Sequence, residues 1–152
     1  LEVPMDSRIS REIHELMFGF VSLFHQKLIP RFRRYDDELP GLKKNHFKIL
    51  GQLFHHNSLT LTQIGRMLDL EKGSVTSLVD HLAEQGLVVR QHVPGDRRKS
   101  LVMLTEAGNA AVRNIIEKQV REIELLMDDI DEEDTRKFVE CLRYCTNMLK
   151  KL

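Results

Sequence analysis

The chain has 152 residues, 41% of them hydrophobic, and its 23 basic and 23 acidic residues leave no net charge. This length suits one domain, or one compact domain with a dimerisation extension. No window approaches the ~18–20 apolar residues of a membrane span, and the N-terminus lacks a basic-then-apolar signal pattern. These features argue against a membrane protein and predict a cytoplasmic one.

A long first helix is predicted from Ser7 to about Tyr35, because apolar residues recur there every three or four positions. Pro30 should end or kink it, and the polar stretch that follows predicts a loop. The apolar stripe is wider than one small domain needs, which suggests a partner helix, for example from a second chain. The stripe consists of Ile9, Ile13, Leu16, Met17, Phe20, Phe24 and Leu28.

The next helix is predicted over residues 42–56, with Asn57 as its stop and a brief strand at Leu59. Its expected inward side chains are Phe47, Leu50, Leu53 and Phe54. Thr60 and Gln63 then form a T-x-x-Q capping box, which predicts a helix over residues 61–68.

A turn at Asp69-Leu70 leads to a second helix over residues 72–85, and Gly86 is expected to cap it in the left-handed conformation. Its expected buried stripe is Val75, Leu78, Val79 and Leu82. Two short segments rich in β-branched residues follow, 87–91 and 100–104, with Pro94-Gly95 between them. They predict a hairpin with a loop of intermediate length.

Two helices are predicted to complete the chain. Thr105 caps the first, which runs to about Met127, and Asp131 caps the second. Cys141 and Cys145 lie four residues apart in the last helix, and we interpret them as small apolar core residues rather than a disulfide.

The second helix of the central pair offers small polar side chains opposite its buried stripe. Small residues let a helix lie deep in the major groove and reach base edges. The alternative is a plain solvated face, and this helix alone does not decide between them. The residues of this face are Lys72, Gly73, Ser74, Thr76, Ser77, Asp80 and His81.

Three cations, Arg97, Arg98 and Lys99, stand at the predicted hairpin tip, from which arginine can enter the minor groove. Asp96 is expected to brace an arginine or to cap the turn. Residues 43–104 hold nine Lys or Arg and five Asp or Glu, a local net charge of +4 that suits a phosphate-facing surface. An exposed charged turn and ordinary scatter of charge are the alternatives.

The segment GDRRKSLVMLTEAG resembles the wing of the MarR family of bacterial transcriptional regulators, D-x-R followed by a strand ending in L-T-x-x-G. The match falls on Asp96, Arg98, Leu104, Thr105 and Gly108. The preceding helix pair is similar to that family's helix-turn-helix and ends in its L-x-x-x-G-L pattern. That pattern falls on Leu82, Gly86 and Leu87.

The resemblance implies a mainly α fold with a small β-hairpin wing. Residues 42–104 would form the winged helix-turn-helix, and residues 1–41 and 105–152 would supply dimerisation helices. The protein would be a homodimeric regulator, most simply a repressor, on a pseudo-palindromic operator in double-stranded DNA. Arg98 would be the minor-groove arginine and Asp96 its brace. Glu71, where many relatives have Ser or Asp, should point away from DNA.

The same resemblance implies a small effector, often aromatic or anionic, between the dimerisation helices and the DNA-binding lobe. The candidate lining residues are His14, Met17, Phe18, Phe47 and Phe54, and core packing is the alternative role for each. The reactive N-terminal cysteine of the hydroperoxide-sensing branch is not found at that place in this sequence.

The sequence also bears on two other classes of function. A winged-helix module that binds protein instead of DNA is disfavoured because Arg97, Arg98 and Lys99 are retained. An enzyme is disfavoured because the sequence has no nucleophile elbow, phosphate loop, paired-carboxylate site or HExxH motif. No cofactor is expected, and no metal site, because His55 and His56 are adjacent and the cysteines lack a nearby His.

Overall fold

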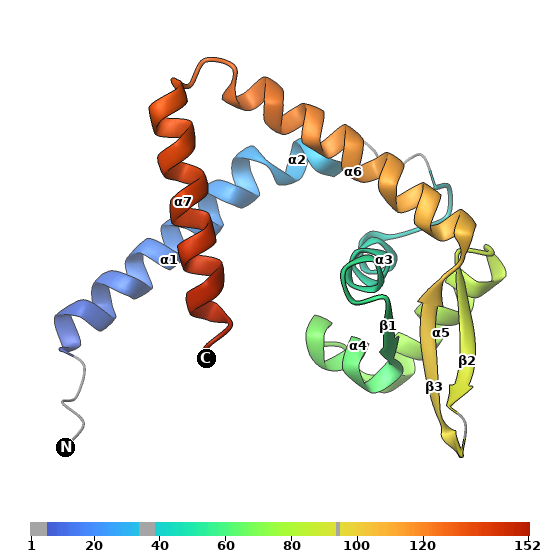
Figure 1. The fold of residues 1–152 in the computed structure, drawn as a ribbon. Coiled ribbons are helices and arrows are strands. Elements are labelled where there is room, and N and C mark those ends of the chain that lie inside the picture. Colours follow the sequence, from blue (N-terminus) through green and yellow to red (C-terminus); the bar gives the residue numbers. More distant parts are fainter. Residues whose placement is uncertain (1–5, 34–38, 94) are drawn as a thin grey trace.

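The computed structural model of the chain describes residues 6–33, 39–93 and 95–152, without the side chains of residues 93 and 96–99. It is mainly helical, with one small sheet. Figure 1 shows a lobe that holds α3, α4, α5 and the strands, and long helices that extend from it. This arrangement confirms the predicted winged helix-turn-helix.

The lobe consists of three helices and a three-stranded antiparallel sheet of order β1-β3-β2. Leu59 of β1 and Arg90 of β2 both pair with Val102 of the central strand, β3. In chain order, the elements are α3 (Lys44–His56), β1 (Ser58–Thr60), α4 (Leu61–Leu68), α5 (Lys72–Glu84), β2 (Val88–Val93) and β3 (Asp96–Leu104).

The predicted caps set the helix boundaries. Thr60 Oγ1 accepts a hydrogen bond from the Gln63 amide at 3.2 Å, and Gln63 Oε1 accepts one from the Thr60 amide at 2.8 Å. Each bond satisfies an amide that has no partner inside the helix. Asn57, with φ of 62°, ends α3, and Gly86, with φ of 71°, follows α5. These boundaries agree with the sequence predictions.

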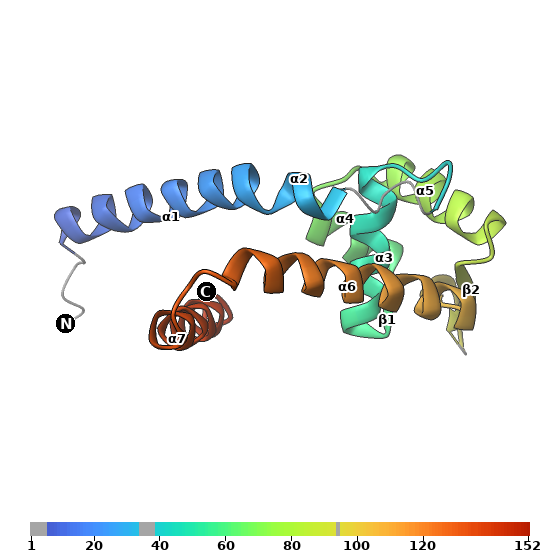
Figure 2. The same ribbon diagram turned by 90° about the horizontal axis from the view of Figure 1, so that it is seen from above.

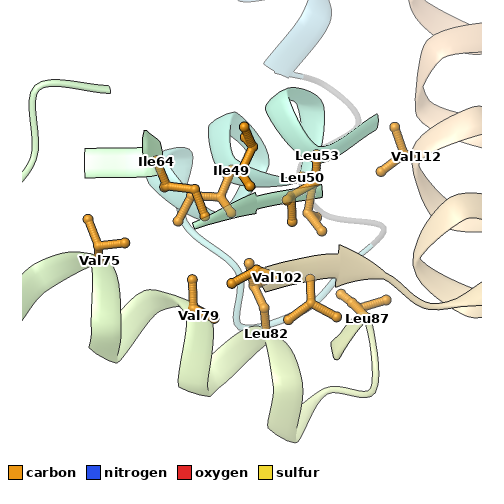
Figure 3. Packing of buried hydrophobic residues seen from close by; sticks show 12 residues of the cluster. Ile49, Leu50, Leu53, Ile64, Val75, Val79, Leu82, Leu87, Val102 and Val112 are labelled. Atoms are coloured by element: carbon orange, nitrogen blue, oxygen red, sulfur yellow. The ribbon is translucent and has the colours of Figure 1, made fainter. Parts of the chain in front are cut away.

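The core lies between α3, α4, α5 and the sheet (Figure 3). Each fully buried aliphatic side chain contributes about 1.5–3 kcal/mol by leaving water. The fully buried residues are Ile49, Leu50, Leu53, Ile64, Val75, Val79, Leu82 and Val102. Val112 of α6 (Glu106–Met127) joins this cluster and attaches α6 to the lobe.

The buried side of α3 differs from the prediction. His46 and Ile49 are buried with Leu50 and Leu53, whereas Phe47 is only half-buried. The prediction placed Phe47 inward because it is apolar. His46 occupies the inward position instead, because hydrogen bonds satisfy both of its ring nitrogens.

The long helices extend to one side of the lobe (Figures 1 and 2). They are α1 (Ser7–Lys27), the short α2 (Ile29–Phe32), α6 and α7 (Glu132–Leu149). The break at Leu28, two residues before Pro30, was expected; the predicted end near Tyr35 lies outside the described residues. An ion pair of 3.3 Å between Arg31 and the buried Glu122 joins α2 to α6. None of the described helices is long and apolar enough to cross a membrane.

The helix α7 has no buried residue, and neither has α1. The two overlap in Figure 1, but Figure 2, from above, shows them apart. Cys141 and Cys145 are therefore exposed, and their interpretation as core residues of this chain is wrong. The apolar stripe on α7 had suggested burial, but within this chain the stripe is left uncovered.

Candidate nucleic-acid interface

The turn between α4 and α5 closes on a glycine. The Gly65 carbonyl accepts hydrogen bonds from the amides of Asp69 and of Leu70, the latter at 2.9 Å. A Cβ on Gly65 would lie 3.0 Å from the Leu70 carbonyl oxygen and 3.5 Å from Val75 Cγ2. Glycine therefore lets the turn and α5 pack closely against α4. Gly65 was not among the residues predicted for this site, although a glycine inside a predicted helix was a usable signal.

The outer face of α5 carries the residues predicted to meet DNA. Val75, Val79 and Leu82 fix its orientation by facing the core. Lys72, Gly73, Ser74 and Ser77 are exposed, as is Asp80, whereas Thr76 and His81 are half-buried. Thr76 Oγ1 donates to the Lys72 carbonyl at 3.0 Å, so this hydroxyl already has a partner in the helix. Glu71 is exposed just before α5, and its side chain makes no capping hydrogen bond.

Arg90 of β2 holds the hairpin against α5, a role that was not predicted from the sequence. Its Nη2 lies 2.7 Å from Asp80 Oδ1 and donates to the Thr76 carbonyl at 3.3 Å. A partly exposed ion pair contributes only about 0–1 kcal/mol. We therefore assign to Arg90 the role of orienting the wing relative to α5 rather than of stabilising the fold. The sequence signal that could have indicated this role was a single cation within a strand rich in apolar residues.

Two histidines connect α3 to α5. The Lys43 amide donates to His46 Nδ1 at 2.9 Å, and His46 Nε2 lies 3.1 Å from His81 Nδ1. The rings meet edge to face, with centroids 4.8 Å apart. Burial, together with the neighbouring His81, lowers the pKa of His46 below 6.5, so this imidazole is neutral at neutral pH.

The wing is longer and tighter than predicted. Val93 pairs with Asp96, so residues 96–99 lie in β3 instead of a loop of intermediate length. Pairing with β2 accounts for this, because the ladder extends beyond the β-branched residues that gave the sequence signal. The side chains of Asp96, Arg97, Arg98 and Lys99 lie outside the described part of the structure. A brace between Asp96 and Arg98 stays a prediction.

A cavity of about 400 Å³ lies between the α1–α2 junction, α3 and α6. It combines cations with aromatic rings, and its lining is His25, Ile29, Phe32, Arg33, Lys44, Phe47, Lys48 and Gln119. Of the five residues predicted to line an effector cleft, Phe47 lies here. His14, Met17 and Phe18 are exposed on α1, and Phe54 packs against the core. Among the described residues, no group of three His, Cys, Asp or Glu side chains could hold a metal ion.

Known proteins are similar to this chain in sequence. Residues 42–100 match the model of the MarR family. The chain is 32% identical over 112 residues to the HTH-type transcriptional regulator MhqR of Bacillus subtilis, covering 74% of this chain and 72% of MhqR. It is also 32% identical over 104 residues to the HTH-type transcriptional repressor YetL of the same organism, covering 67% of this chain and 62% of YetL.

Solved structures share the fold. A MarR-family protein from Bacillus stearothermophilus matches with a TM-score of 0.75 at 24% identity, covering 96% of this chain and 99% of that protein. BpsR of Bordetella bronchiseptica, whose DNA binding is regulated by 6-hydroxynicotinic acid, matches with a TM-score of 0.61 at 20% identity, covering 84% and 91%. Fold and relatives together define a winged-helix DNA-binding transcriptional regulator. The chain belongs to the MarR family.

Proposed function

We propose that the protein is a homodimeric repressor that binds a pseudo-palindromic operator and is released by a small anionic effector. In this proposal residues 42–104 form the DNA-binding unit, and residues 1–41 and 105–152 form the dimer. The observation that carries it is the uncovered apolar surface of α1 and α7, on the same chain as a complete winged helix-turn-helix.

The uncovered surface supports a second copy of the chain as the partner. Contiguous apolar surface of this size is rarely left in water and marks an interface. Phe18 is 72% exposed and Tyr144 is 68% exposed. The exposed apolar residues of the two helices are Ile9, Ile13, Leu16, Met17, Phe18, Phe20, Val21 and Leu23 on α1, and Phe138, Val139, Leu142, Tyr144, Met148 and Leu149 on α7.

Two-fold symmetry determines the form of the operator. A symmetric dimer presents two α5 helices related by a two-fold axis, so it fits inverted half-sites about 10 base pairs apart. The wing of each copy would meet the flanking minor groove. Repression is supported by the relative YetL, which is named a transcriptional repressor.

Selection of bound duplexes from a random pool tests this proposal. We expect enrichment of one sequence made of two inverted half-sites with centres about one helical turn apart. Transcription from a promoter that carries the selected site should fall when the protein is present. Enrichment of a single unpaired half-site, or of no sequence, would overturn the proposal.

Arg98→Ala is expected to weaken binding to the selected duplex by about 1–3 kcal/mol, because a minor-groove arginine is lost. The measurement is a fluorescence titration at fixed salt, since binding to phosphates depends steeply on salt. Arg143→Ala on α7 removes the same charge far from α5 and is the matched control. Wild-type affinity in Arg98→Ala would refute the minor-groove role.

The cavity residues support an aromatic carboxylate as effector. Arg33, Lys44 and Lys48 supply positive charge, and Phe32 and Phe47 supply rings. Charge-assisted hydrogen bonds suit a carboxylate, and an aromatic ring packs on aromatic side chains. Because the cavity adjoins both the α1–α2 junction and α3, an occupant would change the angle between the helical arm and the lobe. That angle sets the separation of the two α5 helices in a dimer.

We expect 6-hydroxynicotinic acid or benzoate to bind and to lower operator affinity. Lys44→Ala should weaken ligand binding about 10-fold, the size of one charge-assisted hydrogen bond, without changing DNA affinity in the absence of ligand. Calorimetry measures the first effect, and Lys151→Ala near the C-terminus is the control. Equal ligand affinity in Lys44→Ala and Lys151→Ala would exclude the cavity as the site.

A further inference from the structure

We infer that His46 and His81 form an ordered donor chain that presents His81 Nε2–H to a hydrogen-bond acceptor on DNA. His81 is thereby a specificity-determining residue, and His46 is its positioning residue. The inference rests on the proposed placement of α5 in the major groove. Its first part, the protonation pattern of the two rings, is independent of DNA.

The hydrogen on His46 is placed by the backbone. The Lys43 amide donates to Nδ1 of His46 at 2.9 Å. A nitrogen that accepts a hydrogen bond offers a lone pair, so the single hydrogen of a neutral His46 lies on Nε2. Burial keeps this ring neutral by lowering its pKa, and only 4% of the residue is exposed.

The position of the hydrogen on His81 follows from the position of the hydrogen on His46. His46 Nε2 and His81 Nδ1 are 3.1 Å apart. Since His46 Nε2 carries hydrogen, it must donate, and His81 Nδ1 must accept. The hydrogen of a neutral His81 therefore lies on Nε2. Donation runs in one direction, from the Lys43 amide through His46 to His81.

The far nitrogen of His81 is open to solvent. His81 is half-buried, and its Nε2 has no hydrogen-bond partner in the part of the chain that the structure describes. Within that same part, the one buried side-chain polar atom without a partner is Nε of Arg90. The Nε2–H of His81 thus remains available to a ligand beside the exposed Ser74 and Ser77.

The chemistry of the DNA partner is that of an acceptor. The major groove offers N7 and O6 of guanine, N7 of adenine and O4 of thymine, and the backbone offers phosphate oxygens. The His46–His81 contact fixes Nε2 of His81 as a hydrogen-bond donor. If His81 were free to change tautomer, its Nε2 could pair with either a donor or an acceptor on DNA. Selectivity for acceptors follows from this contact.

Long-range proton–nitrogen NMR spectra of the imidazoles test the first part in protein without DNA at neutral pH. We expect both His46 and His81 to have a protonated Nε2 and an unprotonated Nδ1. His46→Gln and His81→Gln identify the two signals. A protonated Nδ1 on either ring would overturn the inference, whatever the protein does to DNA.

Conservative variants test the second part on the selected duplex. His46→Gln keeps an N–H donor near the place of Nε2, whereas His46→Asn keeps an acceptor near Nδ1 and loses the donor. We expect wild-type affinity for the first and a loss of about 2- to 10-fold for the second, the range of one ordinary hydrogen bond. His81→Gln and His81→Asn should follow the same order. Equal losses in the Gln and Asn variants would indicate a packing role and refute the inference.

Duplexes that lack single acceptors identify the partner atom. Removing the correct N7, O6 or phosphate oxygen should weaken the wild type but leave His81→Ala unaffected. Coupling to a base atom would support the inference. Coupling to a phosphate oxygen alone would refute the specificity role of His81, because phosphates carry no sequence information, and the absence of coupling at every acceptor would refute the contact itself. Failure of the wild type to bind any duplex would instead refute the proposed function. The NMR result on the protonation of the two rings would not be affected.

Discussion

Replacing Leu142 with glutamate is expected to convert the proposed dimer into a monomer and to lower operator affinity about 100-fold or more. Leu142 lies on the apolar stripe of α7 with Phe138 and Leu149, and all three are exposed in the single chain. A carboxylate on this stripe would have to lose its water in the interface without a partner. Loss of the second lobe removes the effective-concentration gain of about 10²–10⁴ that links two half-sites.

Light scattering at micromolar concentration measures the first effect, and a titration with the selected duplex measures the second. Asn147→Glu introduces the same charge on the opposite face of α7 and should leave both properties unchanged. If Leu142→Glu remains a dimer, α7 does not form the interface that we propose. If it becomes a monomer but keeps full affinity, the requirement for two lobes is wrong.

Gly108→Ala is expected to lower the free energy of unfolding by about 3 kcal/mol or more, because a side chain is forced into a filled space. A Cβ on Gly108 would overlap the Leu87 carbonyl oxygen and come within 3.3 Å of Leu104 Cδ2. The first of these neighbours is backbone, which cannot rotate away. The same carbonyl accepts the Thr105 amide at 3.0 Å, and Thr105 Oγ1 donates to the Gly86 carbonyl at 2.6 Å.

Urea unfolding followed by circular dichroism measures the change. Gly51→Ala in α3 is the control, since a Cβ there meets nothing within 4 Å. It should leave stability unchanged or raise it by up to about 1 kcal/mol, as alanine favours helix. Equal stability of the two variants would show that the contact between the start of α6 and β2 is loose. The packing also gives a physical reason for the glycine of the L-T-x-x-G pattern, Gly108.

Local interactions were the part of the fold that sequence could predict. Thr60 with Gln63, Thr105 and Asp131 lie next to the amides that they cap, so a few residues suffice to place each helix start. The helical spacing of apolar residues located the part of the core on α3 and α5 for the same reason, namely Leu50, Leu53, Val75, Val79 and Leu82. The length of the wing was missed because strand pairing, rather than local preference, extends β2 and β3.

Contacts between distant residues were beyond the sequence. His46 and His81 are 35 residues apart, and no spacing rule connects them. His46 was also hidden because a polar residue in an apolar stripe looks like an outward position, although paired hydrogen bonds allow its burial. Asp80 was assigned to the DNA-facing surface, whereas Arg90 engages it. The stripe of α7 predicted that a face would be covered but could not say by what.

The predicted site residues show the same contrast between local patterns, which the sequence reveals, and contacts between distant residues, which it does not. The predicted DNA-contacting residues of α5 all lie on one short helix, so its periodicity alone was enough to place most of them on the exposed side. Among the predicted effector residues, Phe47 lines the cavity, while the cations of that cavity, Lys44 and Lys48, were read only as general positive charge. A cavity depends on how separate helices meet, and periodicity within one helix carries no information on that.

Hydroxyl-radical footprinting of the selected duplex tests most directly the claim that two copies place α5 in successive major grooves. We predict protected regions on both strands, related by a two-fold axis, with centres about 10 base pairs apart. Flanking minor-groove protection should accompany them and should weaken in Arg98→Ala. Protection of one half-site alone, or of an irregular region without two-fold symmetry, would contradict the account.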